Sequence, residues 1–320
     1  MDLLRDALRV AAHGKLSVFL FHKVPPCADP LLSGDLSEAQ FARLLDFIKE
    51  TFAVLPLGDA VQHLQADTLP PLSAALTFDD GYPEWRHGAV RVLEEKSLPA
   101  TFFITTGQFS GHPMWNERLA QIVRACTGPV LDTTAVRLPP LAIQTANDKA
   151  AAMKQLEFHF KYLPPVVRDD FLEQLEAQSG VSAASVPAMS VDDLIAISNR
   201  GFEIGAHTLE HPILGLCDVD RARDEIGKTR EVLEGIIKRP VTSFAYPNGH
   251  PGVDFSAHHI RMVKQAGYRY AVTTQWGVAD HKTSSYQIPR FTPWGPSRTS
   301  MTLQLMRNFY SRPEHLKELD

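Results

Sequence analysis

The chain has 320 residues, of which 44% are hydrophobic and 22% charged, and its net charge is −5 at neutral pH. This composition provides enough core for one large domain or two ordinary ones, and it lacks the clustered basic face of a nucleic-acid-binding protein. The cysteines Cys27, Cys126 and Cys217 are odd in number and widely spaced, which argues against a disulfide framework or a cysteine zinc site.

The first fifteen residues predict a short amphipathic helix. Charged residues interrupt any apolar segment of the kind found in a secretory signal. The apolar face of this helix could make a peripheral contact with a membrane, and no part of the sequence is apolar enough to span one. We therefore expect a cytoplasmic protein without a transmembrane segment.

Short apolar segments bounded by Gly, Pro or Asn predict a series of buried strands. They are Leu16–His22, Ala53–Leu57, Ala74–Asp80, Ala100–Thr105, Phe202–His207, Ser243–Tyr246, Tyr268–Thr273 and Gln287–Phe291. Helical patterns separate them, with start signals such as Ser37 followed by Gln40. Since parallel neighbours need crossover connections, this alternation predicts a parallel sheet, and its seven or eight repeats indicate a closed or nearly closed barrel.

Residues 111–189 interrupt this alternation. They contain helical patterns at 116–126, 147–162 and 166–178 and no convincing strand pattern. We predict a mostly helical insertion on the barrel. A lid, a substrate platform and a contact surface for another subunit remain open as its role.

The segment LTFDDGY, residues 76–82, runs from an apolar strand into two adjacent carboxylates. In a parallel barrel the active site lies at the C-terminal ends of the strands. Neighbouring residues on a strand point in opposite directions, so Asp79 and Asp80 are expected to have different roles, one at a metal and one at the reacting water. The alternative is an ordinary turn, because Asp-Asp-Gly is common in turns.

The segment EIGAHTLEHP, residues 203–212, places His207 and His211 four residues apart after another apolar strand. On a helical turn this spacing puts both imidazoles on one face, which suits a divalent metal such as zinc. A histidine pair alone is more often a polar surface patch. A barrel, however, would bring both clusters to the same face, and one carboxylate with two imidazoles leaves open positions at a catalytic metal.

These motifs resemble the NodB homology domain of polysaccharide deacetylases, the fourth carbohydrate esterase family. The resemblance rests on TFDDG (77–81) followed by HTLEHP (207–212). It extends to FHKV (21–24), PATFFITTG (99–107), FAYPNG (244–249), AGYRYAVTT (266–274) and IPR (288–290), with FAYPNG similar to a bacterial FAYPYG variant. It covers about residues 15–295, and the insertion is the least matched part.

The resemblance implies a distorted (β/α)7 barrel of the NodB type within a single catalytic domain, residues 1–320. This domain would include the helical insertion at about 111–189 and a C-terminal helical tail at about 298–320. The implied activity is metal-dependent removal of N-acetyl groups from an amino sugar in a polysaccharide or glycan precursor, with release of acetate. Asp79 would be the catalytic base, and Asp80, His207 and His211 would hold one divalent metal, zinc first, with cobalt or nickel as alternatives.

The resemblance also assigns the FAYPNG loop, with Tyr246 and Asn248, to the substrate and its oxyanion. The family's arginine and aromatic positions in this motif are Ala245 and Asn248 here. Arg290, on the last predicted strand, is a candidate substitute that would steady the catalytic carboxylate. The alternative for Arg290 is an ion pair at the surface or barrel rim.

The general acid is less clear, because the family's late Leu-x-His motif has no counterpart. His22, at the end of the first predicted strand, is the candidate, with a buried structural histidine as the alternative. Trp294 would lie near the barrel mouth and could stack on a sugar ring, as could Trp115 and Trp276, although aromatic residues more often belong to a core.

Other functions remain open. The motif residues would catalyse the attack of water on a carbonyl group and do not themselves recognise a sugar. Another metal amidohydrolase or an O-acetyl esterase could therefore use the same scaffold. A non-catalytic carbohydrate-binding module is a further alternative. A glycosidase fits less well, because it needs two carboxylates about 5–10 Å apart around a glycosidic bond. A cytoplasmic deacetylase would act on a soluble or lipid-linked glycan precursor, and the oligomeric state is open.

Overall fold

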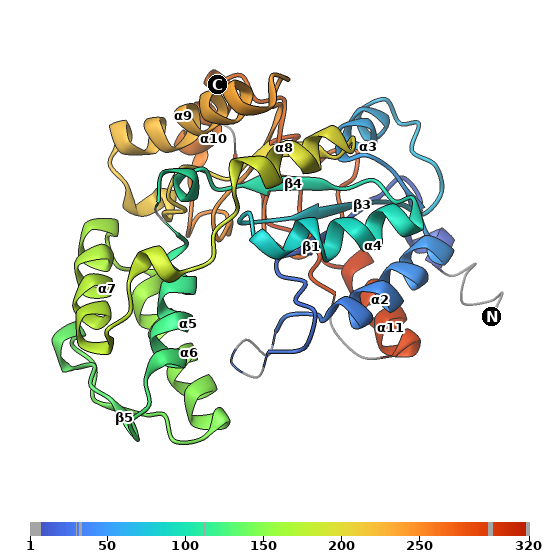
Figure 1. The fold of residues 1–320 in the computed structure, drawn as a ribbon. Coiled ribbons are helices and arrows are strands. Elements are labelled where there is room, and N and C mark those ends of the chain that lie inside the picture. The colour runs from blue at the N-terminus through green and yellow to red at the C-terminus, as the bar shows by residue number, and fades with distance from the viewer. Residues whose placement is uncertain (1–7, 30, 32–33, 112, 294–296, 318–320) are drawn as a thin grey trace.

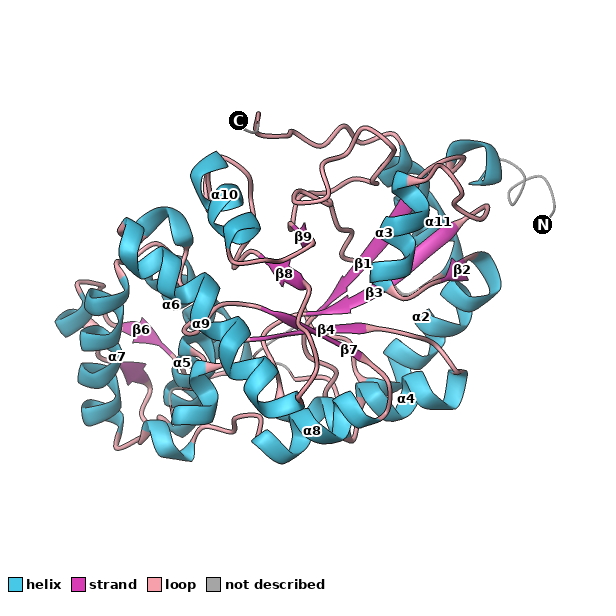
Figure 2. Ribbon diagram, turned by 90° about the horizontal axis from the view of Figure 1, so that it is seen from above, coloured by secondary structure: helices cyan, strands magenta, loops and turns pink. Residues whose placement is uncertain are grey.

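The computed structural model describes residues 8–29, 31, 34–111, 113–293 and 297–317. In this part of the chain, a seven-stranded parallel sheet runs in the order β1-β3-β4-β7-β8-β9, with β2 also paired to β3. Its strands are β1 (Leu16–Phe21), β2 (Ala53–Val54), β3 (Ser73–Phe78), β4 (Thr101–Ile104), β7 (Glu203–Ala206), β8 (Ser243–Ala245) and β9 (Tyr270–Val272). The sheet is curled, which confirms the prediction of a distorted (β/α) barrel (Figure 2).

The last predicted strand, 287–291, is reduced to two isolated parallel bridges. Ile288 pairs with Val272 of β9, and Phe291 pairs with Phe19 of β1. Pro289 has no N–H to donate, so a continuous ladder cannot form here. The two bridges nevertheless join β9 to β1, and they place Arg290 inside the barrel.

Helices surround the sheet, as Figures 1 and 2 show. The main ones are α2 (Glu38–Thr51), α3 (Leu57–Gln65), α4 (Ala89–Lys96), α8 (Val191–Asn199), α9 (Val219–Ile237), α10 (Ala257–Gln265) and α11 (Arg298–Phe309). The predicted capping box of Ser37 and Gln40 is present at the start of α2. Short 3-10 helices include η1 (Pro83–Arg86), which follows the Asp-Asp-Gly turn, and η2 (Gly107–Ser110), which follows β4.

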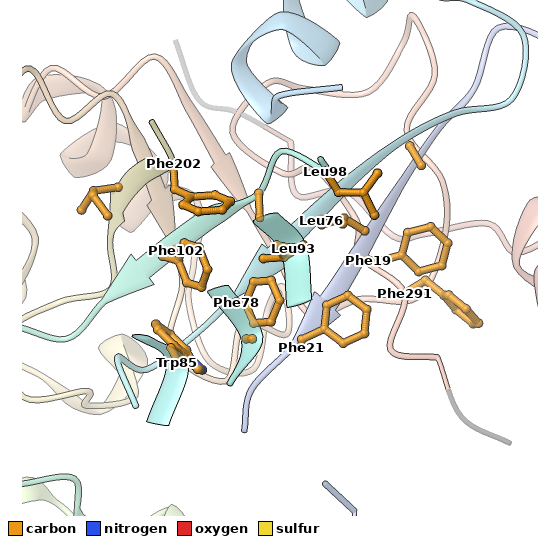
Figure 3. Close-up of a cluster of buried hydrophobic side chains, with 14 of the residues drawn as sticks. Phe19, Phe21, Leu76, Phe78, Trp85, Leu93, Leu98, Phe102, Phe202 and Phe291 are labelled. Carbon is orange, nitrogen blue, oxygen red and sulfur yellow. The ribbon is translucent and has the colours of Figure 1, made fainter. Parts of the chain in front are cut away.

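An aromatic cluster packs between the sheet and its helices below the C-terminal ends of β3 and β4 (Figure 3). Phe78 stacks on Phe102 with ring centroids 4.8 Å apart, and the fully buried Trp85 packs against both. Burial of each such ring stabilises the fold by about 1.5–3 kcal/mol. The cluster therefore gives a rigid base to the strand end that carries Asp79 and Asp80.

Residues 113–189 form a separate group of helices beside the barrel, the green lobe of Figure 1. Its helices are α5 (Trp115–Ala125), α6 (Ala146–Lys161) and α7 (Pro165–Ser179). They enclose their own hydrophobic cluster, which includes Leu119, Leu156 and Leu172. The strands β5 (Val130–Leu131) and β6 (Leu141–Ala142) form an antiparallel pair that the sequence did not predict, because two-residue strands show no periodicity.

At the N-terminus, the described residues 8–11 are helical, and Leu8 and Ala11 are buried in the core of the barrel domain. Across the described residues, every helix is too short or too polar to span a bilayer.

Candidate active site

Asp79 and Asp80 follow directly after β3, and both line one cavity. The expectation that their side chains point in opposite directions was wrong. The strand ends at Phe78, and Asp80 has a φ of +88°, which turns the chain out of the alternating geometry of a strand. Gln108 holds this unusual turn by donating to the Asp80 carbonyl at 3.0 Å while accepting from the Met189 N–H.

His207 and His211 lie on an irregular loop after β7, not on the helical turn that their spacing suggested. Thr208 and His211 both have positive φ angles, of +65° and +53°. Three hydrogen bonds hold this shape. Glu225 of α9 accepts from the N–H groups of Leu209 and Glu210, and the Thr208 hydroxyl accepts from the His211 N–H. The loop brings the two imidazole centroids to 4.8 Å from each other.

The side chains of Asp80, His207 and His211 converge on one point. Asp80 Oδ1 lies 3.3 Å from His207 Nε2 and 3.4 Å from His211 Nε2. The ligand atoms of all three residues lie within 4.8 Å of one another. One carboxylate and two imidazoles are a donor set that suits a divalent metal and leaves coordination positions open.

Neighbouring groups leave the correct atoms of this triad free for a metal. His207 Nδ1 lies 2.8 Å from the Ala245 carbonyl, which can only accept, so Nδ1 carries the proton and Nε2 keeps its lone pair. The Tyr82 hydroxyl donates to Asp80 Oδ2 at 2.8 Å and leaves Oδ1 available. The residues present therefore fit a divalent cation.

Burial and charge set the protonation of the triad. Burial lowers the pKa of His211 to about 3, so its imidazole stays neutral, as a metal ligand must be. Burial opposes ionisation of Asp80, but the two imidazoles outweigh it and lower the pKa of that carboxyl. Burial also disfavours a charged His207, yet Asp79 and Asp80 outweigh it and raise its pKa, which shows how strongly the site attracts positive charge.

Asp79 forms a buried, bidentate ion pair with Arg290. The two guanidinium nitrogens donate to Oδ1 and Oδ2 at 2.7 and 2.6 Å, and Nε donates to the Thr273 carbonyl at 2.7 Å. Arg290 has no exposed surface, which rules out the alternative of a surface or rim pair. Burial opposes ionisation of Asp79, but Arg290 and His207 outweigh it, so the pKa of Asp79 lies below its usual range and the residue is a carboxylate at neutral pH.

The two residues assigned to the oxyanion differ in position. Tyr246 is fully buried, its ring stacks on Phe255, and its backbone N–H donates to the Val272 carbonyl of β9. Asn248 lines the cavity with a φ of +57°, and its backbone N–H donates to no described residue. Of the two residues, Asn248 is therefore the one that lines the cavity with a backbone N–H that has no described acceptor.

Of the remaining predicted residues, His22 lies at the cavity, and Trp276 does not line it. His22 is half-buried and lines the cavity, while its carbonyl accepts from the Trp85 indole at 2.7 Å. Trp276 packs against Phe291 at the edge of the core. Trp294 lies outside the described residues.

The cavity has a volume of about 640 Å³, and its walls come from both parts of the molecule. The barrel contributes His22, Asp79, Asp80, His207, His211 and Asn248, and the insertion contributes Trp115, Asn116, Lys154, Glu157, Phe158 and Lys161. Such a volume accommodates a ligand larger than a single acetamide group.

Sequence reasoning missed the contact between Tyr82 and Asn116. Asn116 Nδ2 of α5 donates to the Tyr82 hydroxyl at 3.3 Å, and that hydroxyl donates to Asp80. Tyr82 closes the LTFDDGY motif and could have been suspected. No pattern in the sequence relates Asn116 to Asp80, because the insertion only meets the site in three dimensions.

Comparison with known proteins identifies the family of this chain. A family model described as polysaccharide deacetylase matches residues 66–155 and 173–271. No curated protein is similar enough in sequence to match this chain.

Several solved structures share the fold at low sequence identity. The deacetylase PplD from Streptococcus pyogenes is 14% identical with a TM-score of 0.61, over 93% of this chain and 99% of that one. IcaB from Ammonifex degensii is 15% identical with a TM-score of 0.60, over 93% and 98%. A de-N-acetylase from Aggregatibacter actinomycetemcomitans is 13% identical with a TM-score of 0.52, over 87% and 94%.

Proposed function

Since this chain belongs to the polysaccharide deacetylase family and is therefore a carbohydrate deacetylase, we propose that it removes N-acetyl groups from an amino sugar with the help of one divalent cation. The reaction converts an acetamide and water into a free amine and acetate. The observation that carries the proposal is the convergence of Asp80, His207 and His211 beside the buried Asp79–Arg290 pair, in one cavity.

The cation would be held by Asp80 Oδ1, His207 Nε2 and His211 Nε2. Zinc suits two imidazoles and a carboxylate best, and cobalt or nickel accept the same donors. When bound, the cation supplies a Lewis acid that polarises the acetamide carbonyl and lowers the pKa of a nearby water.

Asp79 would take the proton from the attacking water. Arg290 holds both of its oxygens, which fixes the plane of the carboxylate toward the triad, and His207 Nε2 lies 3.9 Å from Asp79 Oδ2. A general base must be ionised before the reaction, and the lowered pKa of Asp79 provides this at any pH near neutrality.

Two further groups on the cavity wall would complete the reaction. The Asn248 backbone N–H would donate to the oxyanion of the tetrahedral intermediate, where a fixed donor stabilises developing charge. The His22 imidazole would protonate the departing amine, a step that an amide needs more than an ester does. The N-acetyl specificity is also supported by the structural similarity to a de-N-acetylase.

The test measures metal content and acetate release on the same preparations. Wild-type protein is expected to contain about one equivalent of divalent metal by mass spectrometry, and the His207→Gln, His211→Gln double variant is expected to lose it. Asp79→Asn should keep the metal but release acetate from N-acetylated oligosaccharides about 100- to 10,000-fold more slowly.

His87→Gln is the matched control, because this histidine is exposed and lies outside the cavity. Its metal content and activity should equal those of the wild type. Retention of metal by the double variant would contradict the proposed ligands. Faster release of acetate from an O-acetylated sugar than from its N-acetylated counterpart would identify an esterase instead.

A further inference from the structure

We propose that Thr274 is a positioning residue for the reaction. It holds Asn248 and Gly249, here called the oxyanion loop, in the shape that presents the Asn248 N–H to the cavity. Its backbone also connects this loop to Arg290, which holds the base Asp79. The inference rests on the proposed function, because it takes the Asn248 N–H as the donor to the oxyanion.

The first observation is a pair of hydrogen bonds from Thr274 to the oxyanion loop. Thr274 lies just after the end of β9 and lines the cavity. Its hydroxyl donates to the Asn248 carbonyl, and its N–H donates to the Gly249 carbonyl at 3.1 Å. One residue therefore holds two successive carbonyl groups of the loop, one with its side chain and one with its backbone.

The oxyanion loop needs such support because its backbone conformation is unusual. Asn248 and Gly249 have positive φ angles of +57° and +70°, and a chain keeps such a conformation at Asn248 only when its surroundings enforce it. The Gly249 N–H donates back to the Pro247 carbonyl at 2.6 Å. Since the peptide group between Pro247 and Asn248 is planar and trans, a fixed Pro247 carbonyl also fixes the direction of the Asn248 N–H.

Thr274 also packs directly against the oxyanion loop. A Cβ added at Gly249 would lie 2.9 Å from the Thr274 nitrogen, 3.1 Å from its Cγ2 atom and 2.8 Å from the Tyr246 carbonyl oxygen. These distances leave no space for a side chain at Gly249, so the loop and Thr274 are in close contact. A change at Thr274 is therefore transmitted to the loop.

The peptide group between Thr273 and Thr274 joins the oxyanion loop to the base. Its N–H donates to the Gly249 carbonyl, and its carbonyl accepts from Arg290 Nε at 2.7 Å. Arg290 in turn donates to both carboxylate oxygens of Asp79. The oxyanion donor and the base act on the same acetamide, one at its oxygen and one at the water that attacks its carbon. One planar group thus sets the spacing on which both depend.

The experiment compares Thr274→Val, which keeps the shape of the side chain without its hydroxyl, with Thr274→Ser, which keeps the hydroxyl. Acetate release from N-acetylated oligosaccharides is measured on zinc-loaded protein. Thr274→Val is expected to lower kcat about 10- to 100-fold and to leave KM unchanged, because the oxyanion forms only on the way to the transition state. Thr274→Ser should restore most of kcat, and both variants should keep the metal content of the wild type.

Thr302→Val is the matched control. The Thr302 hydroxyl also donates to a backbone carbonyl, that of Arg298 at 2.9 Å, but it lies in α11 and outside the cavity. This variant should leave kcat and KM unchanged. If denaturant unfolding shows that Thr274→Val does not fold, Thr274→Ala lacks the same hydroxyl and replaces it in the comparison with Thr274→Ser.

The backbone amide NMR signals of Asn248 and Gly249 test the positioning without any turnover. Both signals are expected to shift and broaden in Thr274→Val and to stay at their wild-type positions in Thr274→Ser and Thr302→Val. Unchanged signals in Thr274→Val would overturn the inference, because the loop would then keep its shape without the hydroxyl.

The kinetic outcomes separate this inference from the proposed function. With an active wild type, an unchanged kcat in Thr274→Val would overturn the inference, and so would a raised KM at unchanged kcat or a loss of metal. A wild type that releases no acetate from any acetylated sugar would instead overturn the proposed function, and the amide signals would still show whether Thr274 holds the loop.

Discussion

The barrel and the insertion border the same cavity but build their walls in different ways. The barrel sets its site residues on strained backbone, with positive φ at Asp80, His211 and Asn248, above a fully buried ion pair. The insertion offers Phe158 from a regular helix over a separate hydrophobic cluster.

This difference follows from what each part has to do. Bond-breaking groups must be held to a fraction of an ångström, which requires a rigid core and conformations that a chain adopts only when its surroundings enforce them. A wall that only shapes the cavity tolerates more variation, so a surface helix on its own hydrophobic cluster is sufficient there. Polar contacts between the two parts include Asn116–Tyr82 and Lys23–Glu117.

The largest expected effect comes from breaking the buried ion pair of the barrel, Asp79–Arg290. Arg290→Met leaves Asp79 buried without a partner, so we expect the free energy of unfolding to fall by about 3–5 kcal/mol and acetate release to be lost. Denaturant unfolding and acetate release measure these effects.

Arg118→Met is the matched change in the insertion, where Arg118 makes a bidentate but partly exposed pair with Glu176. It should cost only about 1–2 kcal/mol and leave kcat unchanged. Equal losses of stability and activity in the two variants would break the distinction between the regions.

A smaller effect is expected where the regions touch. Tyr82→Phe removes the hydrogen bond to Asp80 Oδ2, so the metal should bind about tenfold more weakly, measured by competition with a chelator. Asn116→Ala, one bond further away, should weaken the metal less. If Asn116→Ala had the larger effect, the insertion would control the metal site directly.

The smallest expected effect is a change in pH dependence at Asp35, in the loop after β1. Burial raises the pKa of Asp35 to about 7, so between about pH 4 and pH 7 the folded protein holds a proton that the unfolded chain has released. Stability from this group is present at low pH and is lost as the pH rises through 7. Because Asp35 is only half-buried and partly screened by solvent, Asp35→Asn should gain only about 1 kcal/mol over wild type between pH 5 and pH 8, measured by denaturant unfolding. A constant difference across this range would contradict the raised pKa.

The sequence by itself determined the class of fold, the family and the candidate residues of the site. Apolar segments separated by capped helices predict a parallel sheet, and the local motifs TFDDG and HTLEHP resemble those of the family and supply the candidate metal ligands. Periodicity is sufficient for the class of fold, and the resemblance of short motifs is sufficient for the family, because both depend on residues close together in the chain.

Only the tertiary structure decided how those residues are arranged. It turned Asp80 toward the histidines by a positive φ, and it set the proton of His207 through the Ala245 carbonyl. It placed Arg290 on Asp79, 211 positions away, and Trp115 and Phe158 on the wall of the same cavity. Such contacts join segments that are remote in sequence, and their distances follow from how the whole barrel and insertion pack.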